Sequence, residues 1–537
     1  MRAKTANATA SKRFDYVVVG GGTAGCVVAR RLAEDPSTTV CLIEAGPSDE
    51  GNEKVLQLAR WPELLGGELD YDYRIEPQAR GNGAIRHSRA KVLGGCSSHN
   101  SAIAFFPTHV DLQQWERLGG GPEWGPQACA KHIEKIKSTV TLETVQPDNE
   151  LNTAFVQAAV QAGFRQQALN SSDFQSNFGE CVGYFQLNAQ GPKRCSSSVA
   201  YLHPLDKLPS NLTVRTGTCT KKILLTKDSR GIRAGGVLTD SNDPTWQVVH
   251  AAREVIVCAG AFDSPKLLLL SGIGPKQHLE KVGVKCAVDL PGVGEHLLDH
   301  PEGVIIWELN RPVPEIIRQK YEVGLFAKTQ FKDWSDEKGV TDLENGIPDL
   351  MFHFGLESFD MNTKLHGYPT CVKAMSLTPN VTKAKSEGTV RLRSANYKDS
   401  PVIDFKYFTD PEGHDEAVMV EGIRLARRIA EFPAMRAWIK RELAPGIEVE
   451  SDEDISAYVR KTANTVYHPA GTCKMGANSD GMAVVDNKLR VRGVVGLRVA
   501  DASIFPNMPS INPCLTVMLV GEKCADLIKS EPLPARL

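Results

Sequence analysis

Three glycines near the start of the chain have the spacing of a turn that binds a dinucleotide. Gly20, Gly22 and Gly25 form a G-x-G-x-x-G pattern. The first glycine permits a tight turn, the second lets the backbone approach a pyrophosphate, and the third lets a helix pack closely on a strand. Glu44 stands 24 residues after Gly20, where a carboxylate can bind a ribose diol. We therefore predict a dinucleotide site with its phosphates at a helix N-terminus.

A histidine later in the chain is a candidate for acid–base chemistry, because the unperturbed pKa of imidazole lies near neutrality. The chain holds 13 histidines, and His468 is singled out by its place in a short polar run between two predicted core elements. From the pattern alone, a core histidine with an ordinary structural role is the commoner interpretation. His296 and His300 have a metal-ligand spacing, but Pro301 ends any helix there, and no metal site is predicted.

The elements around these residues alternate between strands and helices, which predicts an α/β fold. A β-branched strand at 14–20, a helix at 24–34 and a strand at 39–43 surround the glycine turn. Further strands are predicted at 212–216, 254–258 and 497–500, and helices at 264–270, 414–429 and 516–528. The segment 312–345 is polar and irregular and is expected to contain long loops.

Composition excludes several classes of protein. Of 537 residues, 42% are hydrophobic, and 62 basic against 64 acidic residues leave a net charge of −2. A nucleic-acid binder would normally show a basic excess, and no apolar run reaches the roughly 18 residues that span a bilayer. The 13 cysteines contain no C-x-x-C pair, which favours reduced thiols in an intracellular protein over a zinc site or a disulfide framework.

Several ordered motifs resemble the glucose–methanol–choline (GMC) oxidoreductase family, whose members use FAD. The resemblance runs from residue 14 to about residue 528 and rests on 14–25, 89–101, 260–275, 291–302 and 464–526. It implies a Rossmann-like FAD-binding domain interleaved with an α+β substrate-binding domain that carries an antiparallel sheet. The expected FAD domain comprises 1–159, 202–303 and 464–537, and the expected substrate domain comprises 160–201 and 304–463.

The resemblance assigns the cofactor. FAD is expected to contact Gly20, Gly22, Thr23, Ala24, Gly25, Glu44, Gly95, His99, Asn100, Thr220, Asp501 and Pro513. His99, in the run GGCSSHNS, is implied to be joined covalently to the 8α-methyl group of the flavin. The alternative for His99 is an ordinary surface or core imidazole.

The same resemblance assigns the reacting end of the site. His468 and Asn512 are implied to face flavin N5, where a hydride from the alcohol carbon is accepted. His353 corresponds to a further active-site histidine, and Ser101 to a hydroxyl beside the substrate oxygen.

Glu302 is implied to be the carboxylate that faces a trimethylammonium group. A quaternary ammonium has no N–H, so it is recognised by charge and by aromatic faces; Trp61 and Tyr467 correspond to such faces, and Tyr321 stands where a tryptophan is expected. The implied reaction oxidises choline through betaine aldehyde to glycine betaine and reduces O2 to hydrogen peroxide. Oxidation of another alcohol, and a lyase reaction in which FAD is redox-silent, are the alternatives.

The chain ends in Ala535-Arg536-Leu537, which resembles the Ser-Lys-Leu peroxisomal address. The expected location is therefore intracellular, either cytoplasmic or peroxisomal. The expected partners are a small-molecule substrate and O2, without nucleic acid or membrane, and a homodimer is left open.

Overall fold

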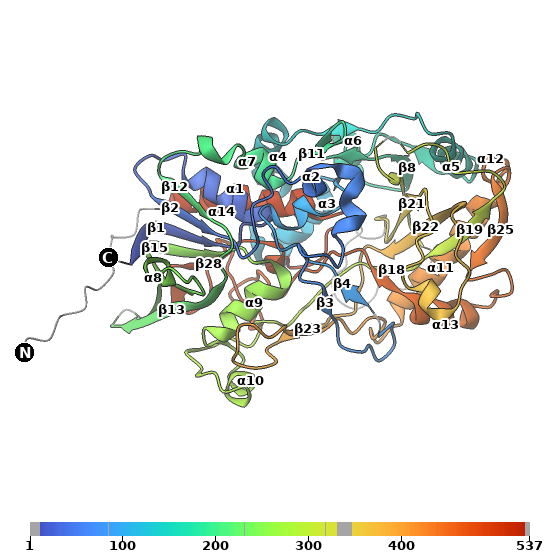
Figure 1. The fold of residues 1–537 in the computed structure, drawn as a ribbon. Coiled ribbons are helices and arrows are strands. Elements are labelled where there is room, and N and C mark those ends of the chain that lie inside the picture. Colours follow the sequence, from blue (N-terminus) through green and yellow to red (C-terminus); the bar gives the residue numbers. More distant parts are fainter. Residues whose placement is uncertain (1–10, 84, 230, 317, 330–345, 532–537) are drawn as a thin grey trace, which may run out of the picture.

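The computed structural model describes residues 11–83, 85–229, 231–316, 318–329 and 346–531, so Ala535-Arg536-Leu537 lies outside the described residues. Two β-sheets stand at opposite ends of an elongated molecule (Figure 1). Within the described residues, no helix is long and apolar enough to cross a membrane. All 13 cysteines are present as free thiols.

The first sheet contains the glycine turn. Its strands run in the order β12 (Leu212–Arg215), β2 (Val40–Ile43), β1 (Lys12–Val19), β15 (Val248–Val257), β14 (Gly231–Thr239) and β13 (Thr220–Asp228), with β27 (Val494–Val495) on β14 and β28 (Leu497–Val499) on β15. The pairs from β12 to β15 are parallel, as is β15 with β28. Parallel strands are covered on both faces, so they are continuously apolar, which is why β1 and β2 were recognisable as buried strands.

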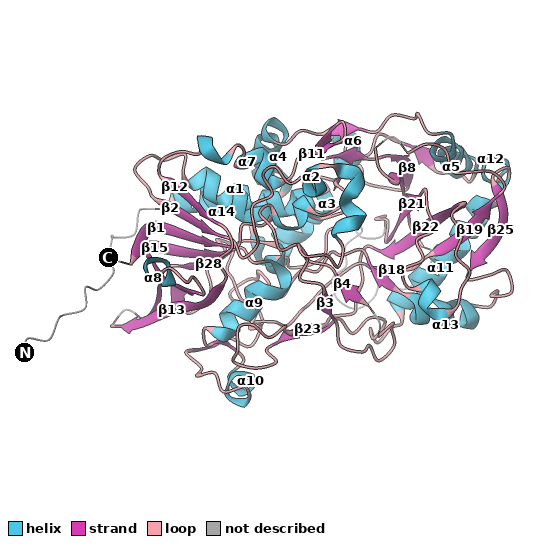
Figure 2. Cartoon of the chain, viewed as in Figure 1, coloured by secondary structure: helices cyan, strands magenta, loops and turns pink. Residues whose placement is uncertain are grey.

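Helices pack around this sheet (Figure 2). The principal ones are α1 (Thr23–Leu32), α4 (Pro126–Thr139), α9 (Gly260–Leu270) and α14 (Cys514–Ser530). Helices α1 and α14 approach closely at Gly521, where a β-carbon would lie 2.9 Å from Cβ of Val27. The structure confirms the predicted helices and strands, although α9 and β15 begin earlier than predicted.

The second sheet is antiparallel apart from one edge pair, β7 with β8, as predicted for the substrate-binding part. Its strands run in the order β25 (Ile439–Ala444), β19 (Ile305–Leu309), β22 (Ala374–Val381), β21 (Leu350–Gly355), β20 (Tyr321–Ala327), β8 (Cys181–Tyr184) and β7 (Arg165–Gln166). Helices α5 (Glu150–Gln161) and α11 (His414–Ala430) pack against this sheet, and α13 (Asp452–Thr462) packs against α11.

The segment 312–345, which was expected to contain long loops, also contains β20, a strand that was not predicted. All seven residues of β20 are buried in the middle of the sheet, and the polar sequence on either side concealed this short apolar strand. Residues 330–345 lie outside the described residues.

Two further short strands belong to the second sheet. β18 (Pro301–Glu302) pairs antiparallel with β26 (Asn464–Thr465), and β18 also pairs with β22 of the second sheet. This pairing places residues 297–302 beside residues 464–470, segments that are far apart in the sequence. The exact boundaries of the two domains remain a prediction.

Candidate active site

A single cavity of about 770 Å³ connects the glycine turn to the second sheet. Every predicted site residue lines it except Gly25, and these residues come from both sheets and from the loops between them. Gly25 instead packs behind the turn, where a β-carbon would lie 1.9 Å from the carbonyl oxygen of Gly20.

The glycine turn is shaped to admit a phosphate. Gly20 has φ +99° and would place a β-carbon 2.4 Å from the Cys258 carbonyl oxygen, so the fold itself requires glycine there. A β-carbon on Gly22 would meet no atom closer than 3.8 Å, so the protein alone does not demand this glycine. Gly22 is the N-cap residue of α1 and provides no side-chain hydrogen bond to the helix. The first N–H groups of the helix, at Thr23 and Ala24, can therefore bind an anion.

Glu44 ends β2 with its carboxylate held by the turn. Its Oε2 accepts a hydrogen bond of 2.8 Å from the Gly21 N–H, and its Oε1 accepts one of 2.7 Å from the Gly46 N–H. Burial raises the pKa of Glu44 to about 7, although these backbone donors oppose the shift. A ribose diol would supply further donors to this buried group, as expected for a dinucleotide.

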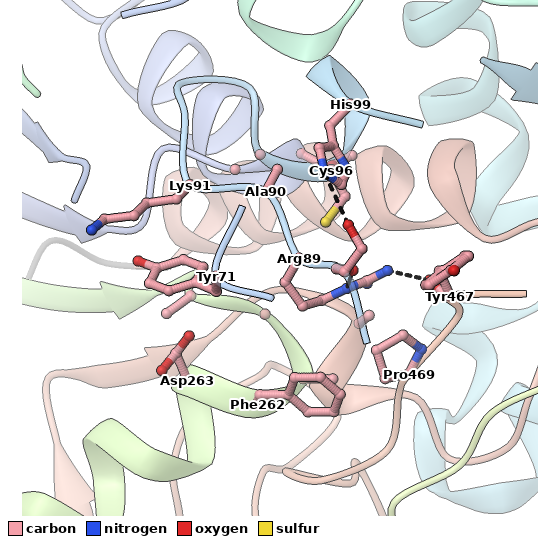
Figure 3. A pocket seen from close by; sticks show the side chains of 18 of the residues that line it. Tyr71, Arg89, Ala90, Lys91, Cys96, His99, Phe262, Asp263, Tyr467 and Pro469 are labelled. Atoms are coloured by element: carbon pink, nitrogen blue, oxygen red, sulfur yellow. Dashed lines mark hydrogen bonds between the residues drawn. The ribbon is translucent and has the colours of Figure 1, made fainter. Parts of the chain in front are cut away.

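His99 lines the cavity, as Figure 3 shows, and the buried carboxylate of Asp70 lies beside it. Its Nε2 is 3.0 Å from Oγ of Ser88 and 3.5 Å from Oδ2 of Asp70. Burial lowers the pKa of His99, and Asp70 partly opposes the shift. The imidazole is therefore neutral at pH 7. Gly95, in the preceding turn, has φ +54° and packs against Gly22.

The remaining predicted cofactor residues line the cavity from four separate segments. Oδ1 of Asn100 accepts a hydrogen bond of 2.8 Å from Arg194, and Oδ2 of Asp501 accepts one of 2.8 Å from the Gly260 N–H. Thr220 begins β13, and its hydroxyl has no partner among the described residues. Pro513 precedes α14, whose N-terminus has no side-chain cap. Unsatisfied donors and acceptors of this kind fit a polar cofactor.

The tautomer of His468 follows from its neighbour. His300 Nε2 is 3.1 Å from the carbonyl oxygen of Pro509, to which it can only donate. The other nitrogen of a neutral His300, Nδ1, is then an acceptor, and it lies 2.9 Å from Nδ1 of His468. His468 must therefore carry its proton on Nδ1, which leaves Nε2 unprotonated and basic.

Both of these histidines are neutral at pH 7. Burial lowers the pKa of His300 to about 4, and burial together with the charges of neighbouring groups lowers the pKa of His468 well below its ordinary value. A neutral imidazole that accepts through Nε2 can take a proton from a bound alcohol.

His353 and Asn512 contact each other in the same cavity. His353, on β21, places Nε2 3.4 Å from Nδ2 of Asn512 and Nδ1 3.4 Å from Nδ2 of Asn380. Burial lowers the pKa of His353 to about 4. The amide oxygen of Asn512 has no hydrogen-bond partner among the described residues, and Ser101 also lines the cavity.

Glu302, on β18, is a buried carboxylate. It is 5% exposed, and burial raises its pKa to about 8, with Thr378 as its hydrogen-bonding neighbour. Among the described residues, no cationic side chain contributes to the pKa of Glu302. A buried acid of this kind is arranged to receive a positive charge from a ligand.

Aromatic rings surround the same end of the cavity. The rings of Trp61 and Tyr321 are 6.1 Å apart, and Tyr321 contacts Phe359 edge-on at 6.2 Å. The Tyr321 hydroxyl donates a hydrogen bond of 2.9 Å to Glu357, which fixes the ring that stands where a tryptophan was expected. Tyr467 also lines the cavity.

Comparison with known proteins identifies the family. GMC oxidoreductase models match residues 14–302 and 384–521. The chain belongs to the GMC oxidoreductase family. Choline oxidase of Arthrobacter globiformis is 47% identical over 97% of this chain and 95% of its own length. Human mitochondrial choline dehydrogenase is 34% identical over 98% of this chain and 92% of its own length.

A solved structure supports the fold of this GMC oxidoreductase and its cofactor. Formate oxidase from Aspergillus oryzae, in a structure that concerns modification of its FAD, superposes with a TM-score of 0.85 at 25% identity and covers 97% of this chain and 99% of the enzyme. The α/β fold with two sheets is that of GMC flavoenzymes, and the chain is an FAD-binding oxidoreductase.

The contacts of three residues of this GMC site were not predicted from the sequence. His300 was considered only as a metal ligand, whereas it orients His468. Ser88 and Asp70 form the surroundings of His99. No sequence pattern links these residues, because each contact joins segments that only the folded chain brings together. Among the described residues, no cluster of three or more His, Cys, Asp or Glu is arranged to hold a metal ion.

Proposed function

We propose that this GMC oxidoreductase oxidises choline through betaine aldehyde to glycine betaine and transfers the electrons to O2, which becomes hydrogen peroxide. The observation that carries the proposal is Glu302, a buried carboxylate for which the described residues supply no cationic partner, at an end of the cavity lined by Trp61, Tyr321 and Tyr467. The 47% identity to a choline oxidase supports the same substrate.

Glu302 selects the substrate by charge. A carboxylate about 4 Å from a cation interacts by roughly 4 kcal/mol at an effective dielectric near 20, and desolvation of both groups offsets part of that energy. The aromatic rings add cation–π attraction and shield the pair from water. A neutral alcohol would leave this carboxylate buried without a partner.

His468 accepts the hydroxyl proton of the substrate at Nε2. His300 holds the tautomer that leaves this atom unprotonated. When bound, FAD supplies the acceptor for the hydride of the alcohol carbon. Asn512, His353 and Ser101 line the cavity beside this position and orient the substrate oxygen through hydrogen bonds.

His99 is the proposed point of covalent attachment to the flavin. Its burial keeps the imidazole neutral, and a neutral ring nitrogen is the nucleophilic form. Ser88 and Asp70 fix the ring beside the cavity. A bond at this position would withdraw electron density from the flavin and favour its reduction.

One experiment separates this function from its alternatives. Flavin bleaching on anaerobic mixing with choline supports the proposal, bleaching with other alcohols alone indicates a different alcohol substrate, and no bleaching indicates a redox-silent lyase. Aerobic turnover of choline with stoichiometric peroxide then establishes O2 as the acceptor. Turnover that needs an added dye would instead indicate a dehydrogenase.

Two finer proposals concern assembly and location. A homodimer predicts twice the chain mass in light scattering. Ala535-Arg536-Leu537 predicts punctate peroxisomal fluorescence of a fusion that ends in these residues, in a host with peroxisomes, and diffuse fluorescence when they are deleted.

A further inference from the structure

Tyr467 has a backbone conformation that is unusual for a bulky residue. Its φ is +65°, in the left-handed region. Apart from glycine, few residues adopt this region, and an aromatic residue stays there only where its surroundings hold it. Tyr467 follows β26 and directly precedes His468, so its backbone determines where the proposed base and one aromatic wall of the cavity stand.

Three hydrogen bonds hold this turn. The Tyr467 N–H donates to Oγ1 of Thr465 at 2.7 Å, and the His468 N–H donates to Oδ1 of Asp299 at 3.0 Å. Arg89 Nη2 donates to the Tyr467 carbonyl oxygen at 2.5 Å, as Figure 3 shows. The peptide groups on both sides of Tyr467 are therefore fixed.

Asp299 connects these contacts. Its Oδ2 accepts hydrogen bonds from the hydroxyl groups of Thr465 at 2.5 Å and Tyr407 at 2.6 Å. Asp299 is 3% exposed; although burial opposes it, hydrogen bonding to His87, Thr465 and Tyr407 keeps its pKa below the ordinary value. The Thr465 hydroxyl therefore accepts from Tyr467 while it donates to a fixed anion.

Asp299 also belongs to the segment that carries the other half of the site. His300, the partner of His468, follows it directly, and Glu302 lies three residues on, opposite Asn464 in the β18–β26 pair. One carboxylate thus ties the segment with the proposed cation-binding acid to the segment with the proposed base.

We propose that Thr465 and Asp299 are positioning residues, which hold Tyr467 in its left-handed conformation and thereby set both the reach of His468 and the preference for a cationic substrate. This inference rests on the proposed function. It predicts that a single hydroxyl group, which acts through the Tyr467 backbone, controls rate and selectivity together.

The test replaces the Thr465 hydroxyl. Thr465→Val keeps the shape of the side chain and removes the hydroxyl, whereas Thr465→Ser keeps the hydroxyl. We expect Thr465→Val to lower kcat/KM for choline by roughly tenfold to a hundredfold, the loss typical of a hydrogen bond to a charged group. The preference for choline over its neutral carbon isostere should fall as well, and Thr465→Ser should stay within about threefold of the parent.

A matched control separates positioning from general destabilisation. Thr472 lies in the same segment, is equally buried and donates a hydrogen bond of 2.6 Å to the Ala261 carbonyl oxygen, away from this turn. Thr472→Val should lower the thermal midpoint while it leaves kcat/KM and the choline preference unchanged. FAD content is measured for each variant, so that loss of cofactor is recognised.

The outcomes are distinct. Thr465→Val within about threefold of the parent, or Thr465→Ser as impaired as Thr465→Val, would overturn the inference. A crystal structure of Thr465→Val in which Tyr467 keeps its positive φ would overturn it as well, and a change of φ would support it. If the parent does not oxidise choline, the proposed function fails, and the same pair of variants is compared on the alcohol that the parent does oxidise.

Discussion

The two ends of the cavity are built in different ways. The dinucleotide end comes largely from one continuous stretch, β1, α1 and β2, and its carboxylate Glu44 is held by two backbone N–H groups. The proposed substrate end is assembled from short segments around residues 101, 302, 353, 468 and 512.

The two ends also differ in the partners of their buried carboxylates. Glu302 has no cationic neighbour among the described residues, and the amide oxygen of Asn512 has no hydrogen-bond partner among them. A fold places unpaired buried polar groups at a cost in stability, so these two groups, like the Thr220 hydroxyl at the cofactor end, mark positions where a ligand is expected to complete the interactions. Substitutions at the substrate end should therefore change the reaction while cofactor binding persists.

The largest effect is expected at His468. His468→Ala removes the base at Nε2 and should lower kcat by about two to four decades, while the flavin spectrum and FAD content stay those of the parent. Stopped-flow reduction of the flavin by choline measures the step directly. His109→Ala, on the exposed start of α3 (His109–Trp115), is the matched control and should behave as the parent. A His468→Ala variant within a few-fold of the parent would transfer the role to His353.

Glu302→Gln should act mainly on the binding of the cation. The substitution keeps the size of the side chain and removes its charge, so KM for choline should rise by roughly one to three decades, at 1.4 kcal/mol per decade. The neutral carbon isostere has the same shape without the charge, and its kinetics should change little. If Glu302→Gln retains the full preference for choline, the aromatic rings alone hold the cation, or choline is not the substrate.

Substrate binding should depend on pH through Glu302. Burial raises the pKa of Glu302 to about 8, so below that pH the acid is protonated and must lose its proton when the cation binds. The dissociation constant of tetramethylammonium should therefore fall about tenfold per unit between pH 6 and 8 and level off above pH 8. His468 titrates well below this range and adds no slope. Glu302→Gln should show a flat profile, and a flat profile in the parent would contradict the assignment.

Local patterns predicted one end of the cavity well and the other poorly. The turn between β1 and α1 and the acid that ends β2 follow from glycine spacing and apolar runs, which are properties of neighbouring residues. The roles of His468, Asn512 and Glu302 could only be proposed by resemblance. The contact between His300 and His468 escaped prediction because it depends on the β18–β26 pair and on the Pro509 carbonyl oxygen. Strand β20 was not predicted because its short apolar run lies inside a polar stretch of sequence.

The smallest effect is expected where the two ends meet, at His99. His99→Asn removes the proposed bond to the flavin, yet the glycine turn and Glu44 remain, so FAD should still bind and should leave the protein on acid precipitation. In the parent, the yellow colour should stay with the precipitate, and a peptide containing His99 should carry the mass of FAD.

Loss of the electron-withdrawing bond should lower the reduction potential of the flavin. A decrease of about 30 mV in the reduction potential corresponds to a tenfold change in the equilibrium constant of a two-electron couple. We expect the rate of flavin reduction by choline to fall by about tenfold or less. This loss is far smaller than the one expected for His468→Ala. Free flavin released from the parent protein would show that His99 holds the cofactor only by contact.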